Sequence, residues 1–383
     1  MQTPSARMRL WEVVGLFLKL GCLSFGGPAA HIALMEHEAV TKRGWLSREH
    51  PLDMLAATSL VPGPNATEMA MHIGFVHAGW PGLLAGGAAF IIPAALISLA
   101  LAAAYKAWGG LPEGAALFYG MNPAVMAVIL VATYRLGRTA IRDWRSVALG
   151  VACIAAALLG VHEVWVLIGA GLAGAVLYAR PGSLAALWLP LVPLLGLAGP
   201  LRAGTWRDNR LVQLALFFLR VGATLMGSGM VFYALVQRDV VVRYAWLTRQ
   251  QLLDAISVGQ MTPGPVISSS TFMGYLIAGL PGAVVSTIAI FLPSFLIVAA
   301  LGPWLPRLRR SRTAKAFLSG VNVAVVALIL VVSASLQRAA LVDVWTVLIL
   351  LLGLAALLRL RLGRLWLVLG GALAGLLRYV LVH

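Results

Sequence analysis

Apolar runs long enough to cross a lipid bilayer follow one another along almost the whole sequence. A membrane-spanning helix needs about 20 consecutive apolar residues. Candidate runs lie at 10–27, 81–104, 115–133, 147–161, 164–177, 211–227, 281–301, 314–335, 342–358 and 365–382. Hydrophobic residues make up 61% of the chain and charged residues only 11%, whereas soluble domains carry about 25% charged residues. The sequence therefore predicts an all-α polytopic integral membrane protein.

The basic residues orient the chain in the membrane. The sequence has 29 Lys and Arg against 13 Asp and Glu, a balance that would indicate nucleic-acid binding in a soluble protein. Here they lie in short gaps between apolar runs, where Lys and Arg mark the cytoplasmic side. No cleavable signal peptide is visible before the first run. We expect a multi-pass protein of a bacterial inner (plasma) membrane. Its expected partner is the lipid bilayer, and no binding to nucleic acid is expected.

The second half of the sequence repeats the first. At an offset of 201, Pro62-Gly63-Pro64 matches Pro263-Gly264-Pro265, and the WLSR of 45–48 matches the WLTR of 246–249. After a slip of one residue the offset is 200, and Pro93 matches Pro293. We therefore expect an N-terminal repeat at 1–180, a linker with an apolar segment at 181–210, and a C-terminal repeat at 211–383.

Charge predicts that the two halves are inverted. Residues 134–146 and 304–315 are strongly basic, whereas 104–115 and 336–344 carry no net charge. Since basic gaps face the cytoplasm, equivalent gaps of the two halves face opposite sides. Inverted repeats are a common architecture of secondary transporters.

Inversion allows two crossing counts. If each stretch around Pro-Gly-Pro (47–79 and 248–279) is a re-entrant hairpin, the protein crosses the membrane 10 times. If each stretch crosses fully and 184–198 crosses as well, the count is 13. The arms are each only about 20 Å long at 1.5 Å per residue, which favours the hairpins.

The Pro-Gly-Pro breaks are candidate anion sites. Proline ends a helix, and the helix that follows starts with N–H groups that have no partner within it. Such a helix start favours an anion, and within a membrane it must be buried in protein or face water. The candidate binding residues are Pro62, Gly63, Pro64, Asn65 and Thr67 in the first half, and Pro263, Gly264, Pro265, Ser268 and Ser269 in the second.

A second break lies in the first apolar run of each half. Gly26 and Gly27 precede Pro28, and the equivalent positions are Gly227 and Ser228. We add these four small residues to the candidate binding site. The alternative is that they let helices pack closely, as small residues do in membranes.

Lys19 and Arg220 are matched cations within the first run of each half. Each lies about 15 Å into its run at the helical rise. Basic residues at this depth are costly and typically line a substrate path. In inverted halves they would neutralise a dianion together, unless their side chains extend to the membrane surface.

Five further polar residues are candidates for proton coupling or gating. Glu68 follows the first break by one turn, where it would carry a proton or interact with the helix start. Asp53 and Asp254 are matched, and each is expected to pair with the matched cations or with loop arginines. His31 and His72 titrate near neutral pH, or pack as polar residues of the interior. No metal-ligand cluster, nucleotide-binding loop or catalytic triad is present, so we expect no cofactor and no enzymatic activity.

Several stretches resemble the chromate ion transporter family. They are 17–21 (FLKLG), 24–28 (SFGGP), 45–47 (WLS), 60–66 (LVPGPNA), 260–265 (QMTPGP) and 272–275 (FMGY). The resemblance covers both halves in the usual order. It implies a duplicated membrane protein that exports chromate from the bacterial cytoplasm using the proton motive force, with sulfate as a structural analogue of the substrate.

Together these features predict a proton-coupled secondary transporter for chromate or a related tetrahedral dianion such as sulfate. One alternative is a passive anion channel that uses the same helix-start site. Another is an intramembrane lipid-handling protein, which the missing catalytic residues disfavour. A homodimer is possible, but nothing in the sequence requires one.

Overall fold

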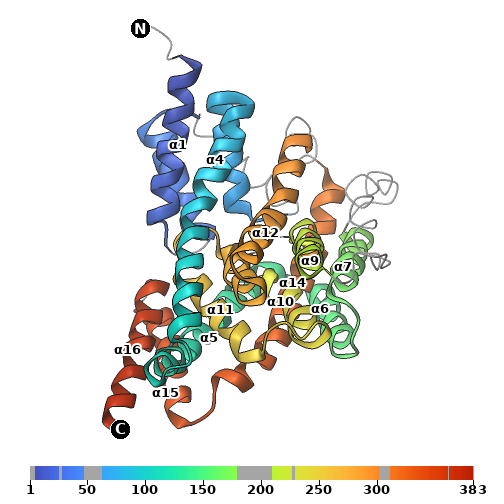
Figure 1. Cartoon of the computed structure of the whole chain (residues 1–383). Helices are drawn as coiled ribbons and strands as arrows, with labels where there is room; N and C mark the ends of the chain where they lie inside the picture. The colour runs from blue at the N-terminus through green and yellow to red at the C-terminus, as the bar shows by residue number, and fades with distance from the viewer. Residues whose placement is uncertain are drawn as a thin grey trace.

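The computed structural model describes residues 5–25, 28–46, 63–178, 209–226, 229–301, 311–360 and 362–382. Within these ranges the chain forms helices joined by turns, and no strand occurs (Figure 1). Six of the candidate site residues lie outside the described residues, as does nearly all of the 181–210 linker. These six are Gly26, Gly27, Asp53, Pro62, Gly227 and Ser228.

The helices occur in the same order in both halves. In the first half they are α1 (Ala6–Leu23), α2 (Pro28–Glu36), the π-helix η1 (His37–Lys42), α4 (Asn65–Trp108), α5 (Pro112–Ala140), α6 (Trp144–Leu158) and α7 (Glu163–Tyr178). In the second half they are α9 (Arg210–Thr224), α10 (Val231–Gln237), the π-helix η4 (Arg238–Arg243), α11 (Arg249–Met261), the 3₁₀-helix η5 (Val266–Ser268), α12 (Ser269–Leu301), α14 (Arg312–Ala340), α15 (Val344–Arg359) and α16 (Arg364–Val382). The described order agrees with the predicted duplication.

In the described part of the chain, five helical stretches are long and apolar enough to cross a membrane, by length and composition. They are Asn65–Trp108, Pro112–Ala140, Val266–Ala300, Arg312–Ala340 and Arg364–Val382. The protein is therefore a multi-pass, all-helical membrane protein.

Matched caps start equivalent helices. Asp143 begins α6 and Asp343 begins α15, each through a capping box with the residue three positions on, Ser146 or Thr346. Such a box satisfies N–H groups that the helix itself leaves without partners. Thr248 and Gln251 form the capping box that the sequence predicts for α11.

A sharp turn divides each of the helices α4 and α12 into two antiparallel pieces. Gly79 has φ 65° and ψ −152°, and Gly279 has φ 66° and ψ −154°, a backbone region open essentially to glycine alone. After the turn the chain packs back on itself so closely that a Cβ on Gly86 would lie 2.8 Å from the carbonyl oxygen of Ala70. Each piece that follows a Pro-Gly-Pro break therefore packs antiparallel against the remainder of its own helix.

The arms of the second Pro-Gly-Pro stretch, α11 and the start of α12, also run antiparallel. A Cβ on Gly259, near the end of α11, would lie 2.8 Å from that of Ser269, at the start of α12. Farther from the break, Tyr105 touches both arms, through a hydrogen bond to Asp254 and a ring contact with Phe272.

Helices α1 and α2 fold back on each other as well. Lys19 near the end of α1 contacts Glu38 in η1, 3.2 Å away. Farther along, Trp45 stacks on His77, which pairs with Glu12 near the start of α1. The first apolar run thus ends at Leu23 and turns back, rather than continuing to residue 27 as the sequence predicted.

The two halves interlock through reciprocal contacts. Helices α4 and α12 lie side by side (Figure 1) and pack antiparallel, since Gly87 contacts Phe295 while Leu83 clusters with Val298. Helix α5 packs on α16 of the other half, and α14 packs on α7. Each half thus contributes its last helix to the other, which is the pattern expected of two units related by a two-fold axis.

Candidate functional site

Four breaks in the helices meet in two pairs between the halves. Gly63, in the first Pro-Gly-Pro, donates its N–H to the carbonyl of Leu225 at the end of α9, 2.6 Å away. Gly264, in the second, donates to the carbonyl of Ser24 at the end of α1, 3.0 Å away. Each Pro-Gly-Pro break therefore contacts the end of the first helix of the other half.

Backbone geometry explains why glycine stands between the prolines. Gly63 has φ 150° and Gly264 has φ 84°, values that residues with a Cβ rarely adopt. The flanking prolines Pro64 and Pro265 have extended backbones and precede α4 and η5. Pro263 lies in the same bend, between α11 and η5.

Buried hydroxyl groups surround the breaks. Ser269 donates to the carbonyl of Val266, 3.0 Å away. Other hydroxyls here have no hydrogen-bond partner among the described residues: Thr67, Ser268, Ser270 and Ser294. All of them are fully buried, so this region holds unused hydrogen-bonding capacity, which a polar ligand needs. The predicted Asn65 is the first residue of α4, beside these groups.

Glu68 lies at the Pro-Gly-Pro break of the first half and is completely buried. Neither carboxyl oxygen has a hydrogen-bond partner among the described residues. A Cβ on Gly63 would overlap its Oε1 and would lie 2.5 Å from the Ser294 hydroxyl. A charged carboxylate in such a place is costly unless it is paired, so Glu68 is a site where a proton can be held.

The two candidate histidines have different surroundings. His31 places Nε2 3.0 Å from the carbonyl of Ser24, the same carbonyl that accepts from Gly264. His31 therefore helps to hold the contact between the end of α1 and the second Pro-Gly-Pro. His72 is buried in α4 before the turn at Gly79, and its Nε2 has no partner among the described residues.

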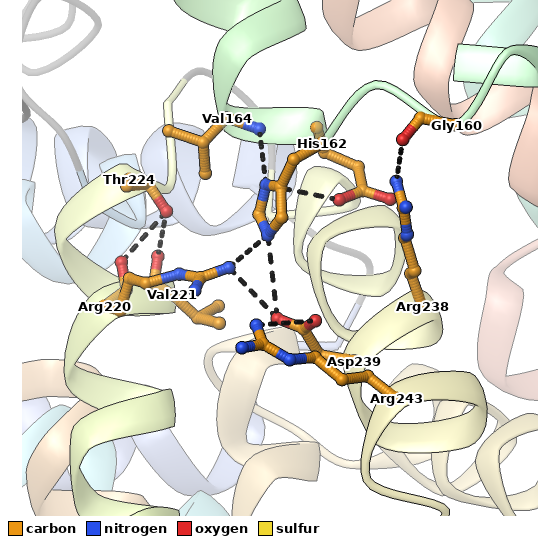
Figure 2. Close-up of polar contacts among 10 residues, drawn as sticks. Gly160, His162, Val164, Arg220, Val221, Thr224, Arg238, Asp239 and Arg243 are labelled. Carbon is orange, nitrogen blue, oxygen red and sulfur yellow. Dashed lines mark hydrogen bonds and ion pairs between the residues drawn. The ribbon is translucent and has the colours of Figure 1, made fainter. Parts of the chain in front are cut away.

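Lys19 and Arg220 are each paired with a carboxylate of their own half. Lys19 lies 3.2 Å from Glu38, which also contacts Lys42 and Arg43. Arg220 lies 3.0 Å from Asp239, on which His162 and Arg243 also converge (Figure 2).

The sequence contained the signal for both carboxylates. Glu38 and Asp239 are separated by 201 residues, the same offset as Lys19 and Arg220. The matched partners expected for the cations were Asp53 and Asp254. The structure places Asp254 elsewhere, and Asp53 lies outside the described residues.

Asp254 lies in a polar network at the wall of a cavity of about 310 Å³. Its carboxylate accepts hydrogen bonds from Tyr105 (2.8 Å), Asn122 (2.8 Å) and Gln250 (3.0 Å). Asn122 in turn accepts one from Ser257, 2.7 Å away, one turn deeper in α11. The network thus leads from the cavity along α11 toward the second break.

Another charged cluster lies at the cavity. Tyr119, which lines the cavity, donates to Asp343, and Arg378 pairs with the same carboxylate at 2.9 Å. Burial opposes ionisation of Asp343, but hydrogen bonds from Tyr119 and Thr346 hold its pKa below the usual value. The charged form of Asp343 thereby ties α5, α15 and α16 together.

No group of three or more potential metal ligands occurs among the described residues. The chemistry that this region supports is binding: donor groups and a buried carboxyl at a break between two interlocked halves.

Comparison with known proteins gives a consistent result. A family model described as Chromate transporter matches residues 11–175 and again 212–376. A chromate transport protein of Cupriavidus metallidurans is 33% identical over 382 residues, covering 98% of this chain and 94% of that protein. A probable chromate transport protein of Synechococcus elongatus is 34% identical over 358 residues, covering 91% and 89%.

A relative of half the length also matches. An uncharacterized transporter of Bacillus subtilis is 30% identical over 162 residues, which cover 41% of this chain but 91% of that protein. One repeat therefore accounts for nearly all of that relative. No solved structure matches the chain.

Proposed function

The chain belongs to the chromate transporter family, and we propose that it is a secondary carrier that exports chromate, or a related tetrahedral dianion such as sulfate, in exchange for protons. The observation that supports this most is the pairwise docking of four helix breaks beside buried, unpartnered hydroxyl groups and Glu68. Broken helices that meet at the interface of two repeats are typical of the substrate sites of such carriers.

Inverted halves are part of the proposal. The antiparallel packing of α4 against α12 and the exchange of α7 and α16 between halves support a two-fold axis. We place that axis in the membrane plane because equivalent gaps carry opposite charge: 134–146 is basic, whereas 336–344 is neutral.

Re-entrant hairpins follow from the same contacts. The antiparallel arms α11 and α12 support the hairpin interpretation of the Pro-Gly-Pro stretches. Because α1 and α2 also fold back on each other, we propose that the first run of each half is a hairpin arm and not a complete crossing. The spans of the first half are then α4 to α7, an even number, so inversion requires one further crossing between the halves. The sequence offers the apolar segment at 184–198, which lies outside the described residues. With it the count is nine, one below the ten expected.

The cavity marks one route between the central site and water. It is lined by Gly109, Ala115 and Val342, which lie at the two gaps without net charge. These gaps are the ones expected to face away from the cytoplasm. An anion that leaves the breaks along α11 would reach the periplasmic side through this cavity.

Glu68 is the proposed proton carrier. It is the one acidic residue that the described residues place against a break, and it has no partner there that would fix its charge. In the proposed exchange, the centre would hold the dianion in one step and a proton on the Glu68 carboxyl in the other. The two steps are linked because each changes the charge at the same buried centre.

The test is chromate flux into liposomes that contain the purified protein, with an imposed pH gradient. Wild-type flux should follow the gradient and fall with excess sulfate. Glu68→Gln should lose the dependence on the gradient while still exchanging chromate for chromate. Glu113→Gln, an exposed residue at the start of α5, is the control and should behave as wild type.

Two outcomes would overturn the proposal. No chromate or sulfate flux from folded wild-type protein would remove the substrate. Single-channel currents in planar bilayers would instead favour the passive channel, because an alternating carrier moves too few ions to be recorded in this way.

A further inference from the structure

Arg364 brings a positive charge to the helix breaks, and no carboxylate among the described residues balances it. It is the first residue of α16, and its Nη1 is buried with no hydrogen-bond partner among the described residues. The groups that interact with it electrostatically are Arg135, Tyr233 and His31. None of these is an anion at neutral pH. A partly buried cation with an unpartnered guanidinium nitrogen is unfavourable in a membrane protein, so a bound anion would stabilise this one.

The neighbours of Arg364 place it beside these breaks. His31 contacts the carbonyl of Ser24, to which Gly264 of the second Pro-Gly-Pro also donates. The Tyr233 hydroxyl would lie 3.1 Å from a Cβ on Gly259, one turn before that break. Arg364 therefore lies where the break between α1 and α2 meets the break between α11 and α12.

Neutral hydrogen-bonding groups accompany the charge. Tyr233 and Gln260 are 3% and 6% exposed. The hydroxyl of Tyr233 lies close to the Ser269 hydroxyl and the Gln260 amide, but neither Tyr233 nor Gln260 has a well-formed hydrogen bond among the described residues. Buried polar groups are nearly always satisfied, so these two also indicate a missing polar ligand.

A second cation faces the same place. Arg135 lies near the end of α5 on an exposed part of the helix, within the basic gap 134–146 expected to face the cytoplasm. It repels Arg364, and no ion pair of either arginine with a carboxylate occurs in the described part of the chain. A dianion bound between two guanidinium groups would relieve this repulsion, and guanidinium is well suited to oxyanions.

Only one half offers this arrangement. At the offset of 201, the positions equivalent to Arg364 and Tyr233 hold Glu163 and Ile32. Glu163 lies beside His162 in the cluster around Asp239. The two halves have thus diverged here, and the cationic version occurs once.

We propose that Arg364 and Arg135 form the cation pair that recognises the transported dianion, with the Tyr233 hydroxyl and the Gln260 amide as its neutral donors. This inference rests on the proposed transport function and specifies its substrate site. It gives these arginines the role that the sequence assigned to Lys19 and Arg220, whose charges Glu38 and Asp239 balance.

The test measures initial rates of chromate transport by wild-type protein and by Arg364→Gln and Arg135→Gln in liposomes. Loss of a hydrogen-bonded charge should raise the KM for chromate about ten- to a hundredfold in Arg364→Gln, and less in the exposed Arg135→Gln. Arg138→Gln removes an equally exposed charge from the same gap and should leave the KM unchanged. Arg364→Lys should fall between wild type and Arg364→Gln, since it keeps the charge but not the planar donors.

Competition with other anions tests recognition of charge directly. Sulfate, a tetrahedral dianion, should inhibit wild-type chromate transport far better than perchlorate, a tetrahedral monoanion. Arg135→Gln and Arg364→Gln should lose this preference. A purely structural role of the arginines would leave the ratio of the two inhibitors unchanged.

The outcomes separate this inference from the proposed function. If wild-type protein carries no chromate, the transport function itself fails. If it does, and Arg364→Gln keeps both its KM and its preference for sulfate, only the cation pair is refuted. If Arg364→Gln does not fold, Arg364→Lys and Arg135→Gln decide by the same two measurements.

Discussion

At Asp239 three side chains from different parts of the chain converge on one buried carboxylate. Asp239 is 3% exposed and Arg220 is 13% exposed, and their atoms lie 3.0 Å apart (Figure 2). Removing one member of a buried pair leaves an uncompensated charge and costs about 3–5 kcal/mol. Arg220→Ala and Asp239→Ala should therefore each lower the unfolding temperature in detergent, and the double variant should recover part of the loss.

The first half provides the matched control. Lys19 is 51% exposed, whereas Arg220 is 13% exposed; Glu38 and Asp239 each have further basic partners. Exposed pairs contribute at most about 1 kcal/mol, so Lys19→Ala should be much milder than Arg220→Ala. Unchanged stability together with a raised KM for chromate in Arg220→Ala would contradict this view and would restore Arg220 as a substrate ligand.

At the scale of single elements, the turn at Gly79 shows how a glycine shapes a hairpin. Nothing lies within 4 Å of a Cβ built there, so the cost of Gly79→Ala is conformational alone. Backbone strain of this kind costs about 1–3 kcal/mol. Gly79→Ala and Gly279→Ala should each lower the free energy of unfolding by about that amount, as measured by thermal unfolding in detergent.

Gly15 is the control for this prediction because its Cβ would also meet open space, within a regular helix. Alanine is favoured over glycine in helices by up to about 1 kcal/mol. Gly15→Ala should therefore be neutral or stabilising. Equal losses at Gly15 and Gly79 would show that backbone conformation does not explain the turn.

Local features of these elements were predictable from sequence, and contacts between halves were not. The Pro-Gly-Pro breaks, the cap of α11 and the run at 81–104 follow from proline chemistry and apolar periodicity. The sequence did not predict the turn at Gly79, because the residues before and after it are similarly apolar. Arg364 precedes an apolar run in the sequence, and its place near Tyr233 of the same half depends on the packing of α16 against α5 and α11, which the sequence does not show.

At the scale of the whole molecule, reciprocal docking ties the two breaks together. Gly63 binds the end of α9 and Gly264 binds the end of α1, so neither break can move without disturbing the first helix of the other half. A carrier needs such coupling, because it must open to one side only after it closes to the other. Two inverted halves that dock in this way supply it through symmetry.

Inversion itself can be tested with two cysteines on equivalent loops. Ile141 and Val342 are exposed, at 42% and 65%, in the loops that follow α5 and α14. In a background with Cys22→Ala and Cys153→Ala, an impermeant maleimide should label Val342→Cys in intact spheroplasts. It should label Ile141→Cys only after permeabilisation, because 134–146 is basic and is expected to face the cytoplasm. Gly110→Cys, in the neutral gap beside the cavity, should label as Val342→Cys does.

If Ile141→Cys and Val342→Cys label from the same side, the halves are parallel repeats. The antiparallel α4 and α12 could then not both be membrane spans of equivalent orientation, and a carrier built on inverted symmetry would be refuted.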